Sequence, residues 1–153
     1  MRRAVPVAAV LAFASGLFAA ADPFAGTWKL NTAKSVYTKG APPKEETVSI
    51  VESGDQLEVT IKGTGADGSA ISTRYTMPTA GGAAKITEGP YDAISAKKTN
   101  FYTREITYSK GGKEIIVFRA VAAKDKRSIR VTVVRGTDLQ GKPVKGTTVF
   151  DKQ

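Results

Sequence analysis

Apolar and polar residues alternate with a period of two along most of the chain after its first 21 residues. The segment 57–62 (Leu-Glu-Val-Thr-Ile-Lys) places its three apolar residues on one face, as a half-buried strand does. The segment 48–50 alternates in the same way, and a two-residue loop at 54–55 would pair Ile50 with Val59. The apolar residues of both strands then lie on the same side, which is the register that such a hairpin requires.

The alternation predicts strands at 24–30, 47–53, 56–63, 70–77, 83–87, 91–97, 101–109, 114–123, 128–135 and 144–151. No segment of useful length with the period of a helix interrupts this series, so we expect an all-β domain. Nearly all connections are short hairpin turns, and the only long one, 31–46, follows the first strand. Because a Greek-key sandwich needs several long crossovers, we expect an up-and-down antiparallel β-barrel, whose closure also removes exposed sheet edges.

The first residues of the chain follow a different pattern. A Met-Arg-Arg start, an apolar run over residues 4–18 and three alanines are typical of a secretory signal peptide. The apolar run is shorter than the roughly 20 residues that a membrane-spanning helix needs. We therefore expect a signal-peptide helix in residues 1–21, cleaved after Ala21, and one exported domain in residues 22–153, periplasmic or secreted. The absence of an Asn-x-Ser/Thr sequon favours a bacterial protein over a eukaryotic glycoprotein.

Two residue types are missing from the 153-residue chain, histidine and cysteine. Without histidine there is no Ser-His-Asp triad and no imidazole metal ligand. Without cysteine there is no disulfide, thiolate nucleophile or zinc cluster, so stability has to come from burial and strand pairing. Glu105 has no identifiable carboxylate partner for paired acid–base catalysis. We expect no catalytic residue, no metal and no cofactor, and we predict that the chain is not an enzyme.

Basic residues outnumber acidic ones, with 23 Lys and Arg against 14 Asp and Glu. Lys97 and Lys98 fall in one turn, and Lys124, Lys126 and Arg127 in another. No recognition helix or RNA-reading strand accompanies them, so we expect no nucleic-acid partner. If successive hairpins alternate between the two ends, these groups share one rim, which could favour an anionic envelope surface or steer an anionic ligand. The alternative is solvated charge that keeps the domain soluble.

The segment 24–31 (Phe-Ala-Gly-Thr-Trp-Lys-Leu-Asn) resembles the first strand of the lipocalins and the wider calycin superfamily. With Lys34-Ser35, a Gly-Thr-Asp…Gly-Lys-Pro turn over residues 136–143 and the closing Asp-Lys-Gln, it is similar to small exported bacterial lipocalin-like proteins. This resemblance implies an up-and-down barrel that holds a ligand, with the Gly-x-Trp segment near its closed end.

Packing explains what the Gly-x-Trp segment would do there. Trp28, the only tryptophan, is expected to plug the barrel floor with its N–H bonded to a backbone acceptor. Gly26 would allow a close approach that a Cβ would block. The resemblance also implies that an arginine late in the chain covers the indole, and Arg135 is the best match, with Arg130 behind it.

The faces of the later strands decide what lines the barrel. With 111–112 as a two-residue loop, Arg104 would pair with Arg119 on a face otherwise made of Tyr, Ile and Val, where like charges are unfavourable unless an anion lies between them. This face could point inward and clamp an anionic headgroup, or point outward with the charges in water. We favour the outward orientation, because the opposite face is nearly uncharged and burying an unpaired arginine costs several kcal/mol.

The expected interior is an apolar cavity with a few polar groups, large enough for side chains or one small ligand. The candidate ligand-binding residues are Ile61, Tyr75, Thr103, Phe118, Val131 and Val133, with Tyr75 and Thr103 as the polar members. We expect a monomer that binds a small apolar or amphiphilic molecule. The alternative is a ligand-free cell-envelope or interaction protein that acts through its basic surface.

Overall fold

The structure is a computed structural model that describes residues 20–153. The alternating segments form eleven strands: β1 (Gly26–Lys39), β2 (Glu45–Ser53), β3 (Gln56–Thr64), β4 (Ala70–Pro78), β5 (Gly81–Ala83), β6 (Lys85–Glu88), β7 (Ala93–Asn100), β8 (Thr103–Lys110), β9 (Lys113–Ala122), β10 (Ser128–Gly136) and β11 (Lys145–Lys152). This confirms the all-β class. The expected signal-peptide helix lies outside the described residues except for its last two positions. In residues 20–153, no helix has the length and apolar character needed to cross a membrane.

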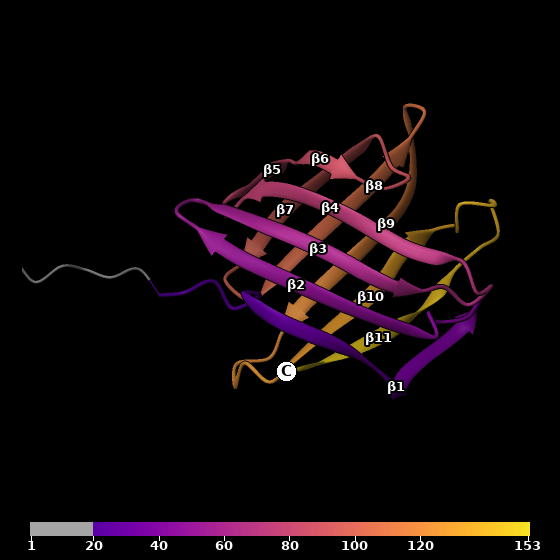
Figure 1. Ribbon diagram of the computed structural model, residues 1–153, viewed down its shortest axis with the longest axis horizontal. Helices are drawn as coiled ribbons and strands as arrows, with labels where there is room; N and C mark the ends of the chain where they lie inside the picture. The colour runs from indigo at the N-terminus through magenta and orange to yellow at the C-terminus, as the bar shows by residue number, and fades with distance from the viewer. Residues whose placement is uncertain (1–19) are drawn as a thin grey trace, which may run out of the picture.

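The strands form one antiparallel sheet that curls into a nearly closed barrel (Figure 1). Neighbours in space are mostly neighbours in sequence, and β1 lies between β2 and β11. The segment 81–88 spans the gap between β4 and β7, where the sheet would otherwise have two free edges. Its first part, β5, pairs with β7, and its second part, β6, pairs with β4. The expected up-and-down topology is therefore confirmed, with one chain segment bridging the seam.

The hairpin of β2 and β3 has the register that the alternation predicts. Ile50 pairs with Val59, and Val48 pairs with Ile61. Gly54 adopts a φ of 60° in the turn between the strands, a conformation that glycine adopts without steric cost. The alternating apolar residues of both strands, Val48 and Ile50 on β2 and Leu57, Val59 and Ile61 on β3, consequently face the barrel interior.

The first strand is longer than the sequence pattern indicates. Residues 31–46 were expected to form a long connection, but β1 continues to Lys39 beyond a bulge between Asn31 and Val36 in its pairing with β11. Side chains hold the bulge: the Asn31 amide donates to the Asp151 carboxylate at 2.6 Å, and the Ser35 hydroxyl donates to the Asn31 carbonyl at 2.7 Å. The strand bends sharply there and closes the barrel beside β11 (Figure 1).

The pairing of β8 with β9 corrects the expected orientation of the two arginines. A register shift between Tyr108 and Ser109 moves the ladder by one residue, so Arg104 pairs with Ala120 and Glu105 with Arg119. A one-residue slip moves a side chain to the other face of a sheet. Arg104 therefore points inward and is buried, whereas Arg119 lies outside beside Glu105. The prediction of two adjacent outward arginines is wrong.

The hairpin turns gather at two ends of the barrel. The N-terminal segment 22–25 and the loops β2–β3, β4–β5, β7–β8 and β9–β10 lie at one end, which we call the closed end (left in Figure 1). The loops β1–β2, β3–β4, β6–β7, β8–β9 and β10–β11 lie at the other end, which we call the mouth. The apolar core runs between them along the barrel axis.

Candidate functional site: a cavity inside the barrel

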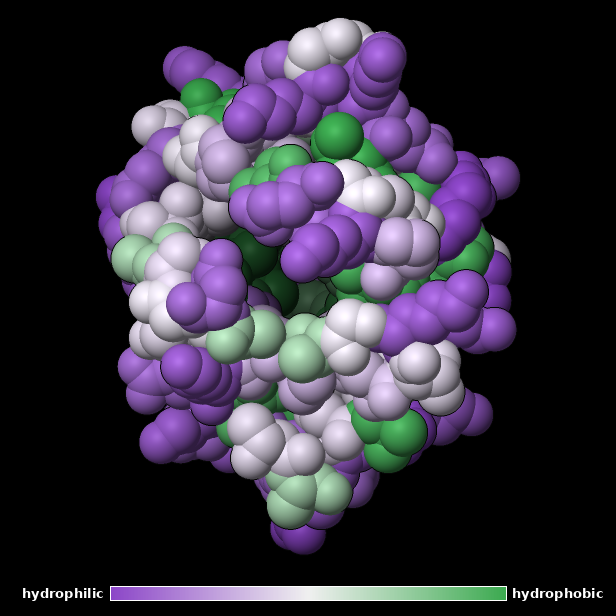
Figure 2. Space-filling view, turned by 90° about the vertical axis from the view of Figure 1, so that its right-hand side faces the viewer, coloured by the Kyte–Doolittle hydropathy of each residue, from purple (hydrophilic) through white to green (hydrophobic). Residues whose placement is uncertain are grey.

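The barrel encloses a cavity of about 500 Å³ that opens at the mouth. Figure 2, which views the molecule from the mouth, shows a deep hollow with apolar side chains inside it and polar side chains around its rim. Parts of the mouth loops, including Pro43, Ser69, Pro90 and Leu139, form the entrance. The walls deeper inside come from β1, β2, β3, β4, β8, β9, β10 and β11.

Four of the six candidate ligand-binding residues line this cavity: Ile61, Tyr75, Phe118 and Val131. Val133 is buried in the apolar core but is not part of the cavity wall. Thr103 pairs with the exposed Val121 and lies on the outer side of β8. The expectation that Thr103 is a polar group of the cavity therefore has to be corrected, and its neighbour Arg104 points inward instead.

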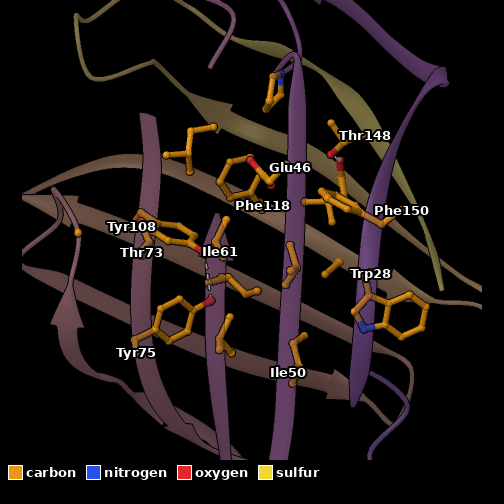
Figure 3. Close-up of a pocket in the computed structure, with 18 of the residues that line it drawn as sticks. Trp28, Glu46, Ile50, Ile61, Thr73, Tyr75, Tyr108, Phe118, Thr148 and Phe150 are labelled. Carbon is orange, nitrogen blue, oxygen red and sulfur yellow. Dashed lines mark hydrogen bonds between the residues drawn. The ribbon is translucent and has the colours of Figure 1, made fainter. Parts of the chain in front are cut away.

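The polar pair in the middle of the cavity consists of Tyr75 and Tyr108 (Figure 3). Their hydroxyl oxygens are 3.1 Å apart, and their rings meet edge to face with centroids 6.2 Å apart. Burial raises the pKa of Tyr75 to about 12 and that of Tyr108 well above its ordinary value. Both phenols are therefore neutral at physiological pH and can donate or accept a hydrogen bond. Sequence reasoning missed Tyr108 because the expected register placed it on the outer face.

Trp28 lies at the closed end, with its side chain fully buried. Its indole N–H donates to the Phe24 carbonyl at 2.8 Å. The ammonium of Lys152, which is paired with Trp28 across β1 and β11, lies 5.5 Å from the centre of its rings. Gly26 has a φ of 138°, and a Cβ there would lie only 3.1 Å from the Lys152 side chain, so the glycine allows this approach.

Arg135 does not cover the indole, contrary to what the resemblance implies. Its guanidinium lies on the outer surface and binds the Glu114 carboxylate through two contacts of 2.7 and 3.2 Å. Lys152 of the last strand takes the position over Trp28 instead. A cation does pack on the indole, but it comes from a different strand and a different residue type.

A buried ion pair closes the barrel below the cavity. The Arg104 guanidinium binds the Asp22 carboxylate, and the exposed fractions of the two side chains are 1% and 4%. Asp22 also accepts a hydrogen bond from the Phe24 N–H at 3.0 Å, and its own N–H donates to the Glu52 carboxylate at 2.8 Å. The guanidinium carbon lies 5.4 Å from the centre of the Phe24 ring. The charge of Arg104 is therefore neutralised, and we assign it a structural role at the closed end.

The other charged side chain of the cavity, Glu46, lies toward the mouth (Figure 3). It comes from β2, and burial raises its pKa to about 7. Tyr37 and Tyr91 line the cavity nearby. Burial raises the pKa of both phenols, and the charge of Glu46 raises it further. Sequence reasoning missed Glu46, although the alternation that places Val48 and Ile50 inside the barrel also places Glu46 there.

Tyr37 reaches this position because of the residue that faces it. Gly146 pairs with Tyr37 across β1 and β11. A Cβ on Gly146 would lie 2.6 Å from the Tyr37 ring carbon Cγ and equally close to the Val36 carbonyl oxygen, which is too close for either contact. Glycine therefore gives the tyrosine room to lie over the last strand.

Two groups of basic residues lie together at the closed end, far from the mouth. Lys97 and Lys98 precede the β7–β8 turn, and Lys124, Lys126 and Arg127 belong to the β9–β10 loop. Because β7 to β10 are consecutive in the sheet, these two turns are neighbours. The expectation that they share a rim is confirmed, but this rim does not surround the cavity entrance.

In the described residues, 20–153, no group of three or more Asp and Glu side chains is arranged to hold a metal ion. No protein-family model matches the chain, and no curated protein or solved structure matches it. The fold and the cavity define a nearly closed, antiparallel β-barrel with an apolar interior that is open at one end. This architecture is consistent with a lipocalin-like fold.

Proposed function

We propose that this chain is an exported, lipocalin-like barrel that binds a small apolar or amphiphilic molecule in its cavity. The observation that carries the proposal is the cavity itself. Its volume of about 500 Å³ falls within the range of roughly 300–1,000 Å³ that is usual for small-molecule sites. Its walls are mainly apolar, with Glu46 and the Tyr75–Tyr108 pair as separate polar contacts, which is the usual composition of such a site.

Packing energetics support a binding role for this space. Protein interiors are normally filled to the density of organic crystals, and a cavity of this size forfeits many van der Waals contacts. Larger side chains at Ala120 or Thr73, which line the cavity, would fill part of it. A barrel that served only as a stable scaffold would gain from such residues, whereas a binding protein needs the space.

The resemblance in the sequence completes the proposal. The signal peptide expected in residues 1–21 would deliver the barrel to the periplasm or the medium of a bacterium, and the segment 24–31 would make it a member of the calycin superfamily. We propose a monomeric binding protein rather than an enzyme. The phenols of Tyr75 and Tyr108 have raised pKa values and are poor bases near neutral pH. The Glu46 carboxyl, whose pKa is about 7, has no second carboxyl group among the cavity-lining residues for paired acid–base catalysis.

The test combines native mass spectrometry with a cavity-filling substitution. Protein purified from its own source should carry a co-purified small molecule. The neutral probe N-phenyl-1-naphthylamine should bind with increased fluorescence, and Ile61→Trp or the milder Ile61→Phe should weaken this binding because Ile61 lines the cavity. Val51→Trp is the matched control, since Val51 is 56% exposed on the outside of β2. Equal binding by Ile61→Phe, Ile61→Trp and the control would contradict the proposal.

One observation favours the alternative, an envelope or interaction protein. Phe101 is 36% exposed at the closed end, 5.5 Å from the Lys98 ammonium and next to the basic β9–β10 loop. An exposed aromatic ring beside basic residues is suited to an anionic membrane surface. Sedimentation with anionic but not neutral vesicles, together with no binding of the neutral probe, would favour this function over ligand binding.

A further inference from the structure

Glu46 is the one charged residue of the cavity wall that no opposite charge balances. The titratable residues that line the cavity are Tyr37, Glu46, Tyr75, Tyr91, Arg104 and Tyr108. Arg104 is neutralised by Asp22 at the closed end. Within the described part of the chain, no basic side chain and no hydrogen-bond donor lowers the pKa of the Glu46 carboxyl, which burial alone raises. When Glu46 is ionised, the cavity therefore holds one unbalanced negative charge.

Aromatic rings surround this carboxyl on several strands. Burial is the main cause of the raised pKa values of Tyr37 on β1, Tyr91 in the β6–β7 loop and Tyr108 on β8, and the charge of Glu46 raises all three further. The rings of Tyr91 and Tyr108 have centroids 4.9 Å apart, and Phe118 on β9 meets Tyr108 edge to face at 5.6 Å. Figure 3 shows Glu46 next to Phe118, on the mouth side of Tyr108.

The other residues that line the cavity toward the mouth carry no charge. Thr148 on β11 lies on the other side of Glu46 in Figure 3. The mouth loops contribute Pro43, Ser69 and Leu139 to the wall, and β4 contributes residues 70–73. Gly63 is the partner of Glu46 on β3 and has no side chain. A carboxylate among aromatic faces is a suitable environment for an organic cation, because the charges attract and the negative faces of the rings add to the attraction.

On this basis, and resting on the ligand-binding function proposed above, we propose that the cavity selects amphiphiles that carry a basic amine. The ammonium group would lie at the Glu46 carboxylate against the tyrosine rings, and the apolar part would extend toward Trp28 at the closed end. The mainly apolar wall between these two points, which includes Val48, Ile50 and Ile61, fits an alkyl or aromatic tail.

Proton balance gives this proposal a measurable signature. Below pH 7 most free protein holds a proton on Glu46, because its pKa is about 7. A protonated amine that binds there displaces this proton to solvent, so the affinity should fall as the pH decreases. From pH 8 to pH 6 the ionised fraction of Glu46 falls about tenfold, and the apparent affinity for an amine should fall about tenfold with it. The affinity for an uncharged ligand should not fall in this way.

The experiment compares three probes that share a ten-carbon tail: decylamine, decanol and decanoate. Titration calorimetry at pH 8 should show that decylamine binds about tenfold or more tightly than decanol, as expected for a charge-assisted contact, and that decanoate binds most weakly. Glu46→Gln should reduce decylamine binding to the level of decanol while decanol binding is retained. Glu45→Gln is the matched control, because it removes the same charge from an exposed neighbouring residue of β2.

The outcomes separate this proposal from the one on which it rests. Decanol binding without a preference for decylamine, or a preference that survives Glu46→Gln, would overturn the amine assignment and leave the ligand-binding function standing. Binding of none of the three probes to the wild-type chain would overturn both. Proton release at pH 6 but not at pH 8, measured in buffers of different ionisation enthalpy, would support the assignment of Glu46.

Discussion

The buried pair of Asp22 and Arg104 offers a sharp test of how the barrel is closed. Asp22→Asn keeps the size of the side chain but removes the charge that neutralises Arg104. The guanidinium would then remain at the closed end with an exposed fraction of 1%, and its Nε and Nη1 atoms already have no hydrogen-bond partner among the described residues.

Removing one partner of a buried pair typically costs about 3–5 kcal/mol, because the other charge is left unpaired. We expect Asp22→Asn and Arg104→Met each to lower the free energy of unfolding by about 3 kcal/mol. The double variant leaves no unpaired charge, so its loss should be smaller than the sum of the two single losses by about 2–3 kcal/mol. This shortfall measures the coupling of the two residues.

The assay is equilibrium unfolding in guanidinium chloride, followed by circular dichroism and by the emission of Trp28. A neighbouring pair supplies the control: Arg119 and Glu105 are 3.5 Å apart, and their side chains are 55% and 30% exposed. Glu105→Gln should cost no more than about 1 kcal/mol, as is usual for exposed pairs. The pair does not hold the closed end if Asp22→Asn lowers the free energy of unfolding by no more than this control. The same conclusion follows if the losses of Asp22→Asn and Arg104→Met simply add in the double variant.

Two further substitutions test other charges. Folding raises the pKa of the Glu46 carboxyl from 4.5 to about 7, so ionisation of Glu46 destabilises the folded wild type progressively as the pH rises from 4.5 to 7. Glu46→Gln removes this penalty and should stabilise the chain by about 3 kcal/mol at pH 8. Unfolding curves at pH 4.5, 6 and 8 should show the gain disappear at the lowest pH. Lys152→Met should change the Trp28 emission spectrum and cost about 0.5–1 kcal/mol, whereas Arg135→Met should leave the emission unchanged.

The alternation of apolar residues was enough to predict most of the strands and the barrel topology. The β2–β3 hairpin shows why: its turn is short, and the observed register places the alternating apolar residues of both strands on the same, inner side. The interior positions of Ile61, Phe118 and Val131 follow from the same local rule. Local periodicity predicts which side of a strand is buried wherever the ladder has no bulge.

Bulges and long-range pairs account for most of what the sequence pattern did not predict. The register shift between Tyr108 and Ser109 turned Arg104 to the opposite face from the expected one. The alternation of apolar and polar residues gives no sign of where this shift occurs. The anion that makes an inward Arg104 tolerable is Asp22, which is 82 residues away in the chain. The argument that an inward arginine needs a negative partner was sound, but the partner could not be identified from local sequence.

The two charges inside the barrel differ in what they contribute. Arg104 is matched by an acidic residue, stacks on Phe24 and lies at the closed end, so its burial is consistent with a role in stability. Glu46 is unmatched, and its ionisation near neutral pH opposes folding. A neutral residue at this position would give a more stable barrel, as commonly found for residues that serve binding rather than folding. An amine bound at Glu46 would supply the missing charge, and the free energy lost on folding would be recovered when the ligand binds.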